Sequence, residues 1–200
     1  MKRLMIGLMA CAAMVSASAG YYSPLDDYTI SHGQKVILQE TRKIDTLEAY
    51  RISMELYGQS MENGIDFNFA LALMRTESRF KKSALSPQGA IGLMQILPST
   101  GKKISELYSI EYRDMWSIED NISLGMAYIK HLKIRYGKYE YVAAGYNGGP
   151  VGAKKYMEYM EGKKRAESIH RETREYVPKV VDLWKKYQKM EIDYIFSSRS

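Results

Sequence analysis

Residues 67–80 read FNFALALMRTESRF, and after a short basic connection residues 86–100 read SPQGAIGLMQILPST. The first segment has helical apolar spacing, and four of its positions follow one another at steps of three, four and three: Phe67, Ala70, Met74 and Glu77. They share one face of a helix whose first turn Asp66 can cap. Glu77 therefore stands where the apolar stripe would otherwise continue.

A carboxyl group on an apolar helical face loses hydration, which penalises its charged form and raises its pKa. Such an acid can protonate a leaving oxygen near neutral pH, so Glu77 is the candidate catalytic residue. The alternative is a structural glutamate at the helix end, partly exposed and paired with one of the cations nearby: Arg75, Arg79 or Lys81.

The following loop is rich in glycine and in uncharged hydrogen-bonding groups. Gly89 and Gly92 allow the backbone to approach a ligand closely, Ser86 and Gln95 supply neutral donors and acceptors, and Met94 supplies an adaptable apolar contact. These groups suit an uncharged polymer such as a glycan. A tight turn between two helices is the alternative interpretation of this loop.

The rest of the chain predicts an all-α fold with one globular core. Apolar spacing predicts a helix over about residues 31–57 and another that begins at Pro98. A third predicted helix is capped by Asp120 and Asn121 and ends at Gly137, and a last one has Pro178 in its first turn. A strong turn signal lies at residues 146–150. The expected organisation is an N-terminal helical arm at residues 20–52, which packs on the domain or on a partner, and a catalytic domain at residues 53–200.

The first residues resemble a secretory signal. Lys2 and Arg3 precede an apolar stretch and a small-residue site, so residues 1–19 are predicted to be removed by cleavage after Ala19. Cys11, the single cysteine, lies inside this segment, and a lipoprotein anchor at Cys11 is the alternative. No later stretch is apolar and long enough to span a membrane. We therefore expect an exported protein of the periplasm or cell envelope.

The distribution of charged residues and histidines excludes some classes of partner and cofactor. The formal net charge is +6, but the basic clusters are interleaved with acids, which is typical of solvated helical faces, and no nucleic-acid partner is expected. The three histidines are scattered and lack metal-ligand spacing, so neither a metal nor a cofactor is expected.

Four motifs in order resemble the lytic transglycosylases of the soluble type, whose catalytic domain is lysozyme-like. They are ESRF at residues 77–80, SPQGAIGLMQI with Pro98 at residues 86–98, AGYNGGP at residues 144–150 and ETREYV at residues 172–177. Asn121, Ile122, Gly125 and Tyr128 fit the helix between them. Gly145 departs from the alanine usual in the family, and the resemblance does not cover residues 21–52.

The resemblance implies a lysozyme-like fold and cleavage of the β-1,4 bond between N-acetylmuramic acid and N-acetylglucosamine in peptidoglycan, forming a 1,6-anhydro end. Glu77 would protonate the glycosidic oxygen and then accept a proton from the muramyl C6 hydroxyl. Tyr146 would hydrogen-bond Glu77, and Tyr176 would close the cleft. The implied sugar contacts are Asn147, Ser86, Gln95 and Met94.

Two other functions stay open. A hydrolytic muramidase would need a second carboxylate, and the formal candidates are Asp114, Glu119 and Asp120. A peptidoglycan-binding protein of an envelope assembly would keep the cleft without the catalysis, with an envelope protein as a possible partner of the N-terminal arm.

Overall fold

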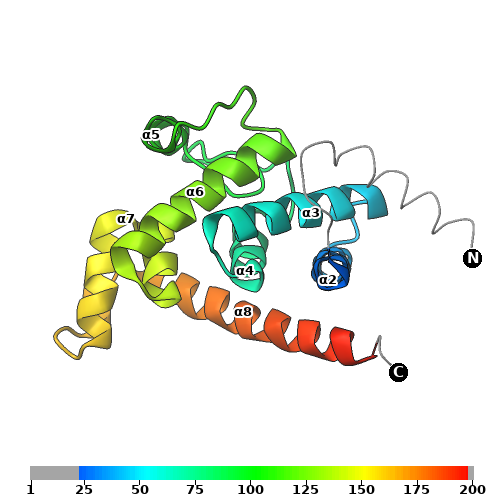
Figure 1. Cartoon of the computed structure of the whole chain (residues 1–200). Coiled ribbons are helices and arrows are strands. Elements are labelled where there is room, and N and C mark those ends of the chain that lie inside the picture. The colour runs from blue at the N-terminus through cyan, green and yellow to red at the C-terminus, as the bar shows by residue number, and fades with distance from the viewer. Residues whose placement is uncertain (1–22, 198–200) are drawn as a thin grey trace, which may run out of the picture.

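The computed structural model describes residues 23–197, and helices make up most of this range (Figure 1). They are α2 (Pro24–Glu40), α3 (Thr46–Asn63), α4 (Phe67–Ser78), α5 (Pro98–Tyr108), α6 (Ile118–Tyr136), α7 (Tyr139–Met160), the 3-10 helix η1 (Ala166–Ser168) and α8 (Arg171–Ser197). Within residues 23–197 the β pairing is limited to isolated bridges of Ile91 with Leu85 and with Ile96. The predicted all-α fold is confirmed.

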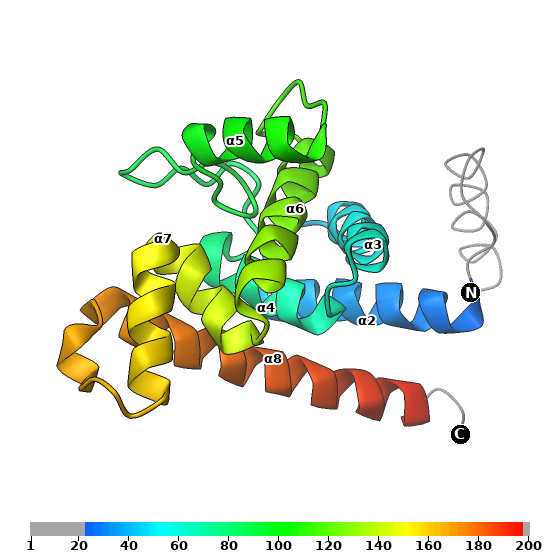
Figure 2. The same ribbon diagram turned by 60° about the vertical axis from the view of Figure 1, so that its left-hand side comes forward.

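Helix α4 lies at the centre of the molecule. Every side chain from Phe67 to Met74 is buried, which is typical of a helix enclosed on all sides. Helices α8, α3 and α2 pack against it, and Figure 2 shows α4 between α6 and α8. Asp66 caps the helix as predicted, since its Oδ1 accepts a hydrogen bond from Phe69 N at 2.8 Å.

The N-terminal arm contains two helices where the sequence predicted one. Helix α2 ends at Glu40, and Asp45 caps α3 by accepting a hydrogen bond from Glu48 N at 2.8 Å. Three apolar residues of α2 are buried in the common core: Ile30, Val36 and Ile37. The arm therefore packs on the domain, and the expected boundary at residue 52 falls inside α3.

Helix α8 is the longest helix, with 27 residues, and runs past α7, α4 and α2 (Figure 1). It begins at Arg171, so the prediction that Pro178 starts this helix is wrong. Pro178 is exposed inside α8, where the buried neighbours Tyr176, Val177 and Val180 hold the helix against the core. Packing thus outweighs the helix-breaking tendency of proline.

Polar links fix the second half of α8 to the core. Trp184 Nε1 donates a hydrogen bond to Asp66 Oδ1 at 2.9 Å. Glu191 accepts hydrogen bonds from Asn68 Nδ2 at 2.6 Å and from Thr29 Oγ1 at 2.9 Å. These bonds join α8 to both α4 and α2.

Helix α6 begins earlier than predicted. Ser117 is its N-cap and accepts a hydrogen bond from Asp120 N at 3.1 Å, while Gly137 ends the helix as expected. Asp120 instead accepts hydrogen bonds from Arg113 N and Asp114 N, and Asn121 is buried. The predicted cap at Asp120 and Asn121 is therefore wrong.

The signal segment at residues 1–19, with Cys11, lies outside the described residues. Across residues 23–197 we find no helix with the length and apolar character needed to cross a membrane.

Candidate active site

Glu77 lies in the last turn of α4, on the face predicted from the apolar spacing. Phe67, Ala70 and Met74 on this face are buried, and Glu77 itself is half-buried. The helix ends directly afterwards because Arg79 and Phe80 take the left-handed conformation, with φ of 54° and 63°. Two non-glycine residues in that region are uncommon, so this sharp exit is held by its surroundings, including the fully buried Phe80 ring.

The hydroxyl of Tyr176, on α8, donates a hydrogen bond to Glu77 Oε1. The Tyr146 hydroxyl, expected to make that bond, donates to the Met94 carbonyl oxygen at 2.7 Å. The hydrogen bond to Glu77 that was expected from Tyr146 is thus made by Tyr176. Both phenols lie near the acid, since the charge of Glu77 raises the pKa of each.

Burial raises the pKa of Glu77 to about 7. The hydrogen bond from Tyr176 opposes this rise because it favours the ionised carboxylate, the charge of Glu172 adds to it, and the charge of Lys179 opposes it. The structural alternative for Glu77 is not observed, because Arg75 pairs with Glu40 at 2.8 Å. Glu77 can therefore carry its proton near neutral pH.

The loop after α4 is closed by backbone and side-chain hydrogen bonds to α6. Asn121 Oδ1 accepts from Met94 N at 2.7 Å, and its Nδ2 donates to Ile91 O at 3.0 Å and Met115 O at 2.8 Å. A Cβ on Gly92, where φ is +76°, would lie 2.4 Å from Asn121 Nδ2. Glycine is therefore required at Gly92 both for conformation and for space.

Three of the expected sugar contacts are used by the loop itself. Ser86 Oγ accepts a hydrogen bond from Ala90 N at 3.0 Å, and Gln95 Nε2 donates to the carbonyls of Ala84 at 3.1 Å and Gly92 at 3.0 Å. Met94 is fully buried under Gly125, where a Cβ would lie 2.6 Å from it. Its side chain therefore shapes the loop from below and is not open to a ligand, contrary to expectation.

Asn147 lies inside α7, two residues before a kink at Gly149. Its Nδ2 donates to Glu172 Oε1 at 2.9 Å, and its Oδ1 accepts from Thr173 Oγ1 at 2.8 Å. The predicted turn at residues 146–150 is a single non-helical residue, Gly149, with φ 63° and ψ −165°, between two helical stretches. The kink sets Asn147 against the start of α8.

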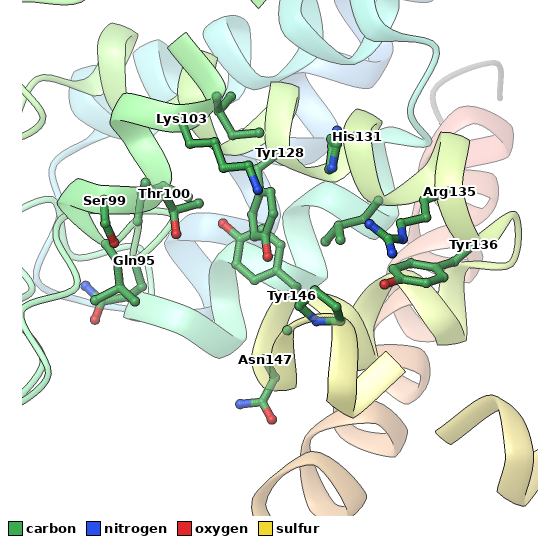
Figure 3. A pocket seen from close by; sticks show the side chains of 16 residues that line it. Gln95, Ser99, Thr100, Lys103, Tyr128, His131, Arg135, Tyr136, Tyr146 and Asn147 are labelled. Atoms are coloured by element: carbon green, nitrogen blue, oxygen red, sulfur yellow. The ribbon is translucent and has the colours of Figure 1, made fainter. Parts of the chain in front are cut away.

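A cleft of about 450 Å³ runs beside these residues, between the loop, α5, α6 and the kink of α7 (Figure 3). This volume lies within the range of about 300–1,000 Å³ typical of ligand sites. Gln95, Tyr146 and Asn147 line it, whereas Glu77 is not among the lining residues. The cleft thus brings together three of the expected residues, which come from segments far apart in the chain.

Residues 57–169, more than half of the chain, match the family model of the transglycosylase SLT domain. The chain belongs to this family. Its SLT domain is 34% identical to the soluble lytic murein transglycosylase of Salmonella typhimurium over 127 residues, which are 58% of this chain and 20% of that protein. It is 32% identical to the corresponding protein of Escherichia coli K12 over 143 residues, covering 66% of this chain and 22% of that protein. The chain therefore spans about a fifth of the length of these relatives.

Solved structures resemble the SLT domain over most of the chain. The 70 kDa soluble lytic transglycosylase of Escherichia coli matches with a TM-score of 0.63 and 27% identity, covering 82% of this chain and 29% of that one. The lytic transglycosylase Slt of Pseudomonas aeruginosa, solved as an inactive glutamate-to-glutamine mutant, matches with a TM-score of 0.59 and 28% identity, covering 67% and 23%. The expected lysozyme-like fold is confirmed.

Sequence reasoning missed two polar residues of this SLT domain. Asn121 was expected as a helix cap. Its buried amide instead hydrogen-bonds backbone groups of Met94, Ile91 and Met115, and no local sequence pattern predicts such contacts. Glu172 was noted within a motif but not as a carboxylate near Glu77. In the described part of the chain, we find no group of three or more His, Cys, Asp or Glu side chains placed to hold a metal ion.

Proposed function

We propose that this protein is a peptidoglycan lytic transglycosylase. It cleaves the bond between N-acetylmuramic acid and N-acetylglucosamine, and the muramyl C6 hydroxyl attacks to form a 1,6-anhydro end. The observation that carries the proposal is a half-buried Glu77 carboxyl with a pKa of about 7 close to Tyr146, which lines the cleft, in a chain of the SLT family. The names of the relatives, lytic murein transglycosylases, support it.

In this proposal Glu77 is both the acid and the base. As the protonated acid it donates to the glycosidic oxygen, and as the carboxylate it then accepts the proton of the C6 hydroxyl. Tyr176 holds the carboxyl in place, and its hydrogen bond stabilises the carboxylate formed in the first step. The intramolecular attack gains from proximity if the cleft holds the sugar in a reactive pose.

The sugar contacts are assigned to the groups that border the cleft. Asn147, fixed by Glu172 and Thr173, is oriented to meet the acetamido and hydroxyl groups of the substrate. Gln95 keeps its side-chain carbonyl oxygen for a ligand, because its hydrogen bonds to Ala84 O and Gly92 O both use Nε2. The Tyr128 and Tyr146 rings, with centroids 5.0 Å apart, give the wall an apolar aromatic surface suited to a sugar ring.

The direct test is digestion of purified sacculi followed by mass spectrometry of the muropeptides. We expect 1,6-anhydro ends from the unmodified protein. Glu77→Gln keeps the size and polarity of the side chain but removes the acid, so the rate should fall by about 10²- to 10⁴-fold. Glu55→Gln is the matched control, because burial also raises the pKa of Glu55 but this residue does not line the cleft. Full activity of Glu77→Gln would refute the catalytic assignment.

A hydrolytic muramidase is the second candidate, and the proximity of Glu172 favours it. Of the carboxylates named from the sequence, Glu119 pairs with Arg51 and Asp120 binds loop backbone, so neither is placed as a partner of Glu77. Glu172 could position a water molecule instead. Hydrolysis would be established if the unmodified protein produced reducing ends in place of anhydro ends and Glu172→Gln no longer produced them. Binding of sacculi without any cleavage would instead identify a peptidoglycan-binding protein.

We also propose that the protein is exported to the periplasm or cell envelope after removal of residues 1–19. N-terminal sequencing of the exported protein tests this, and Gly20 is the expected first residue. A protein partner on the N-terminal arm would meet its exposed apolar side chains, Leu25 on α2 and Leu47 on α3, because the inner residues of the arm lie in the core.

A further inference from the structure

The cleft has an electrostatic character that the glycan alone does not explain. None of the described residues that line it is Asp or Glu, whereas three basic side chains do: Lys103, His131 and Arg135. The sugars of a peptide-bearing glycan strand are uncharged, because the lactyl carboxyl group of each muramyl residue forms an amide with the peptide. Carboxylates, which readily accept hydrogen bonds from sugar hydroxyls, are the acceptors this wall lacks.

The three basic residues lie close to one another at the end of the cleft formed by α5 and α6. His131 and Arg135 are one helical turn apart on α6, and Lys103 projects from α5 (Figure 3). Burial is the main cause that lowers the pKa of His131, and the positive charges of Lys103 and Arg135 lower it further, so both cations lie near the imidazole. The Tyr108 hydroxyl lies 3.4 Å from His131 Nδ1.

Neither cation is neutralised by the protein. The ion pairs formed within residues 23–197 involve neither Lys103 nor Arg135. The Arg135 guanidinium lies over the Tyr136 ring, 5.5 Å from its centroid, which leaves its N–H groups able to reach an anion in the cleft. This end of the cleft is therefore prepared for a negatively charged group.

We propose that Lys103 and Arg135 bind the free carboxylates of the peptides attached to the muramyl residues, so that the protein prefers peptide-bearing glycan strands to peptide-free strands. The inference rests on the proposed function, since it assigns the substrate of the same cleft. The sugars occupy the part bordered by Gln95, Tyr146 and Asn147, and the peptide reaches towards α5 and α6. The peptide carboxylates are the anions that peptidoglycan places next to its uncharged sugars.

The test compares two substrates made from the same sacculi. One is intact glycan strands, and the other is strands whose peptides have been removed by an amidase that cuts between the muramyl lactyl group and the first amino acid, and whose freed lactyl carboxylates have then been converted to uncharged amides. The measured quantity is the ratio of the initial rates of anhydro-end formation on the two substrates. Charge-assisted hydrogen bonds to two cations predict a ratio of about ten for the unmodified protein.

Lys103→Gln/Arg135→Gln should lower this ratio to about one, and each single variant should lower it about threefold. The matched control is Lys102→Gln/Arg113→Gln, which removes the same net charge from exposed residues outside the cleft and should keep the ratio. Circular dichroism checks that all variants are folded. Raising the ionic strength from about 0.1 M to about 1 M should also reduce the ratio, because screening becomes stronger.

A ratio near one for the unmodified protein, or an unchanged ratio in the double variant, would overturn the inference. Failure of the proposed function is a different result, namely no anhydro ends from either substrate. In that case binding of the two kinds of strand to the Glu77→Gln variant, measured by co-sedimentation, decides the inference. Preferential binding of peptide-bearing strands that is lost with Lys103 and Arg135 would support it, and equal binding would overturn it.

Discussion

Two opposing effects set the pKa of the Glu77 carboxyl: burial raises it, and the hydrogen bond from the Tyr176 hydroxyl lowers it. Because that hydroxyl favours the carboxylate, Tyr176→Phe should raise the pKa of Glu77 above its present value of about 7. If the protonated acid starts the reaction, kcat/KM falls as pH rises through this pKa, and the alkaline limb of the Tyr176→Phe profile should lie at higher pH. The rate at the optimum should also fall, because the carboxyl is less well held.

The control for that profile is Tyr146→Phe. The Tyr146 hydroxyl donates to the Met94 carbonyl and not to Glu77, so its loss should reduce the rate without moving the alkaline limb upwards. An alkaline limb of Tyr176→Phe that moves to lower pH would contradict the assigned hydrogen bond.

The same carboxyl makes stability depend on pH. Between the ordinary pKa of 4.5 and about 7, the folded protein keeps the Glu77 proton while the unfolded chain releases it, so this group lowers the free energy of unfolding as pH rises through that window. Glu77→Gln removes the effect. Its free energy of unfolding relative to the unmodified protein should increase from pH 4.5 to 7 by up to about 3 kcal/mol. Urea unfolding at several pH values measures this, and a difference independent of pH would contradict the raised pKa.

Local sequence spacing predicted the position of Glu77 but not its partner. Steps of three and four residues place a side chain on a helical face, and the structure confirms that face. Whether Tyr146 or Tyr176 reaches the carboxyl depends on how α8 docks, which is a matter of long-range packing. Met94 has the character of a contact residue, but Gly125 lets α6 pack directly over it.

The kink in α7 depends on the conformation of one glycine. Gly149 has φ 63° and ψ −165°, a region that is almost exclusive to glycine, and a Cβ there would meet no atom within 4 Å. Gly149→Ala should therefore destabilise the protein by about 1–3 kcal/mol through backbone strain alone. Gly58→Ala, inside α3 and also free of close contacts, should stabilise it by about 0.4–1 kcal/mol.

Urea unfolding midpoints of the two glycine variants test the kink. Equal stability of Gly149→Ala and the unmodified protein would mean that α7 can run through this point without the bend. The sequence AGYNGGP predicted an interruption here but not its extent, since either glycine of the pair could take the unusual conformation and a full loop would carry the same letters.

We expect the described chain to unfold as one cooperative unit, because α2 and the start of α3 supply part of the core within residues 23–197. A chain beginning at Ser53 would lose the buried Ile30, Val36 and Ile37 and the hydrogen bond from Ser53 Oγ to Ile30 O at 2.6 Å. Each such aliphatic side chain contributes about 1.5–3 kcal/mol, and a whole domain has about 5–15 kcal/mol. The shortened chain should show no cooperative thermal unfolding by circular dichroism, whereas a chain of residues 23–200 should.

A Ser53 chain that unfolds cooperatively near the midpoint of the longer one would instead support a separate catalytic domain with an added arm. At this scale the sequence predicted helix content and a single core correctly. It left open whether the arm packs on that core or on a partner, because apolar spacing shows that a face is covered but not by which element.

The bond between Tyr176 and Glu77 spans 99 residues of chain. During translation at about 5–20 residues per second, the ribosome adds Tyr176 about 5–20 s after Glu77. Throughout this interval the nascent polypeptide has its acid but neither the tyrosine that holds it nor the helix that covers α4. Synthesis order alone thus delays completion of the Glu77 site until nearly all of the described chain has been made.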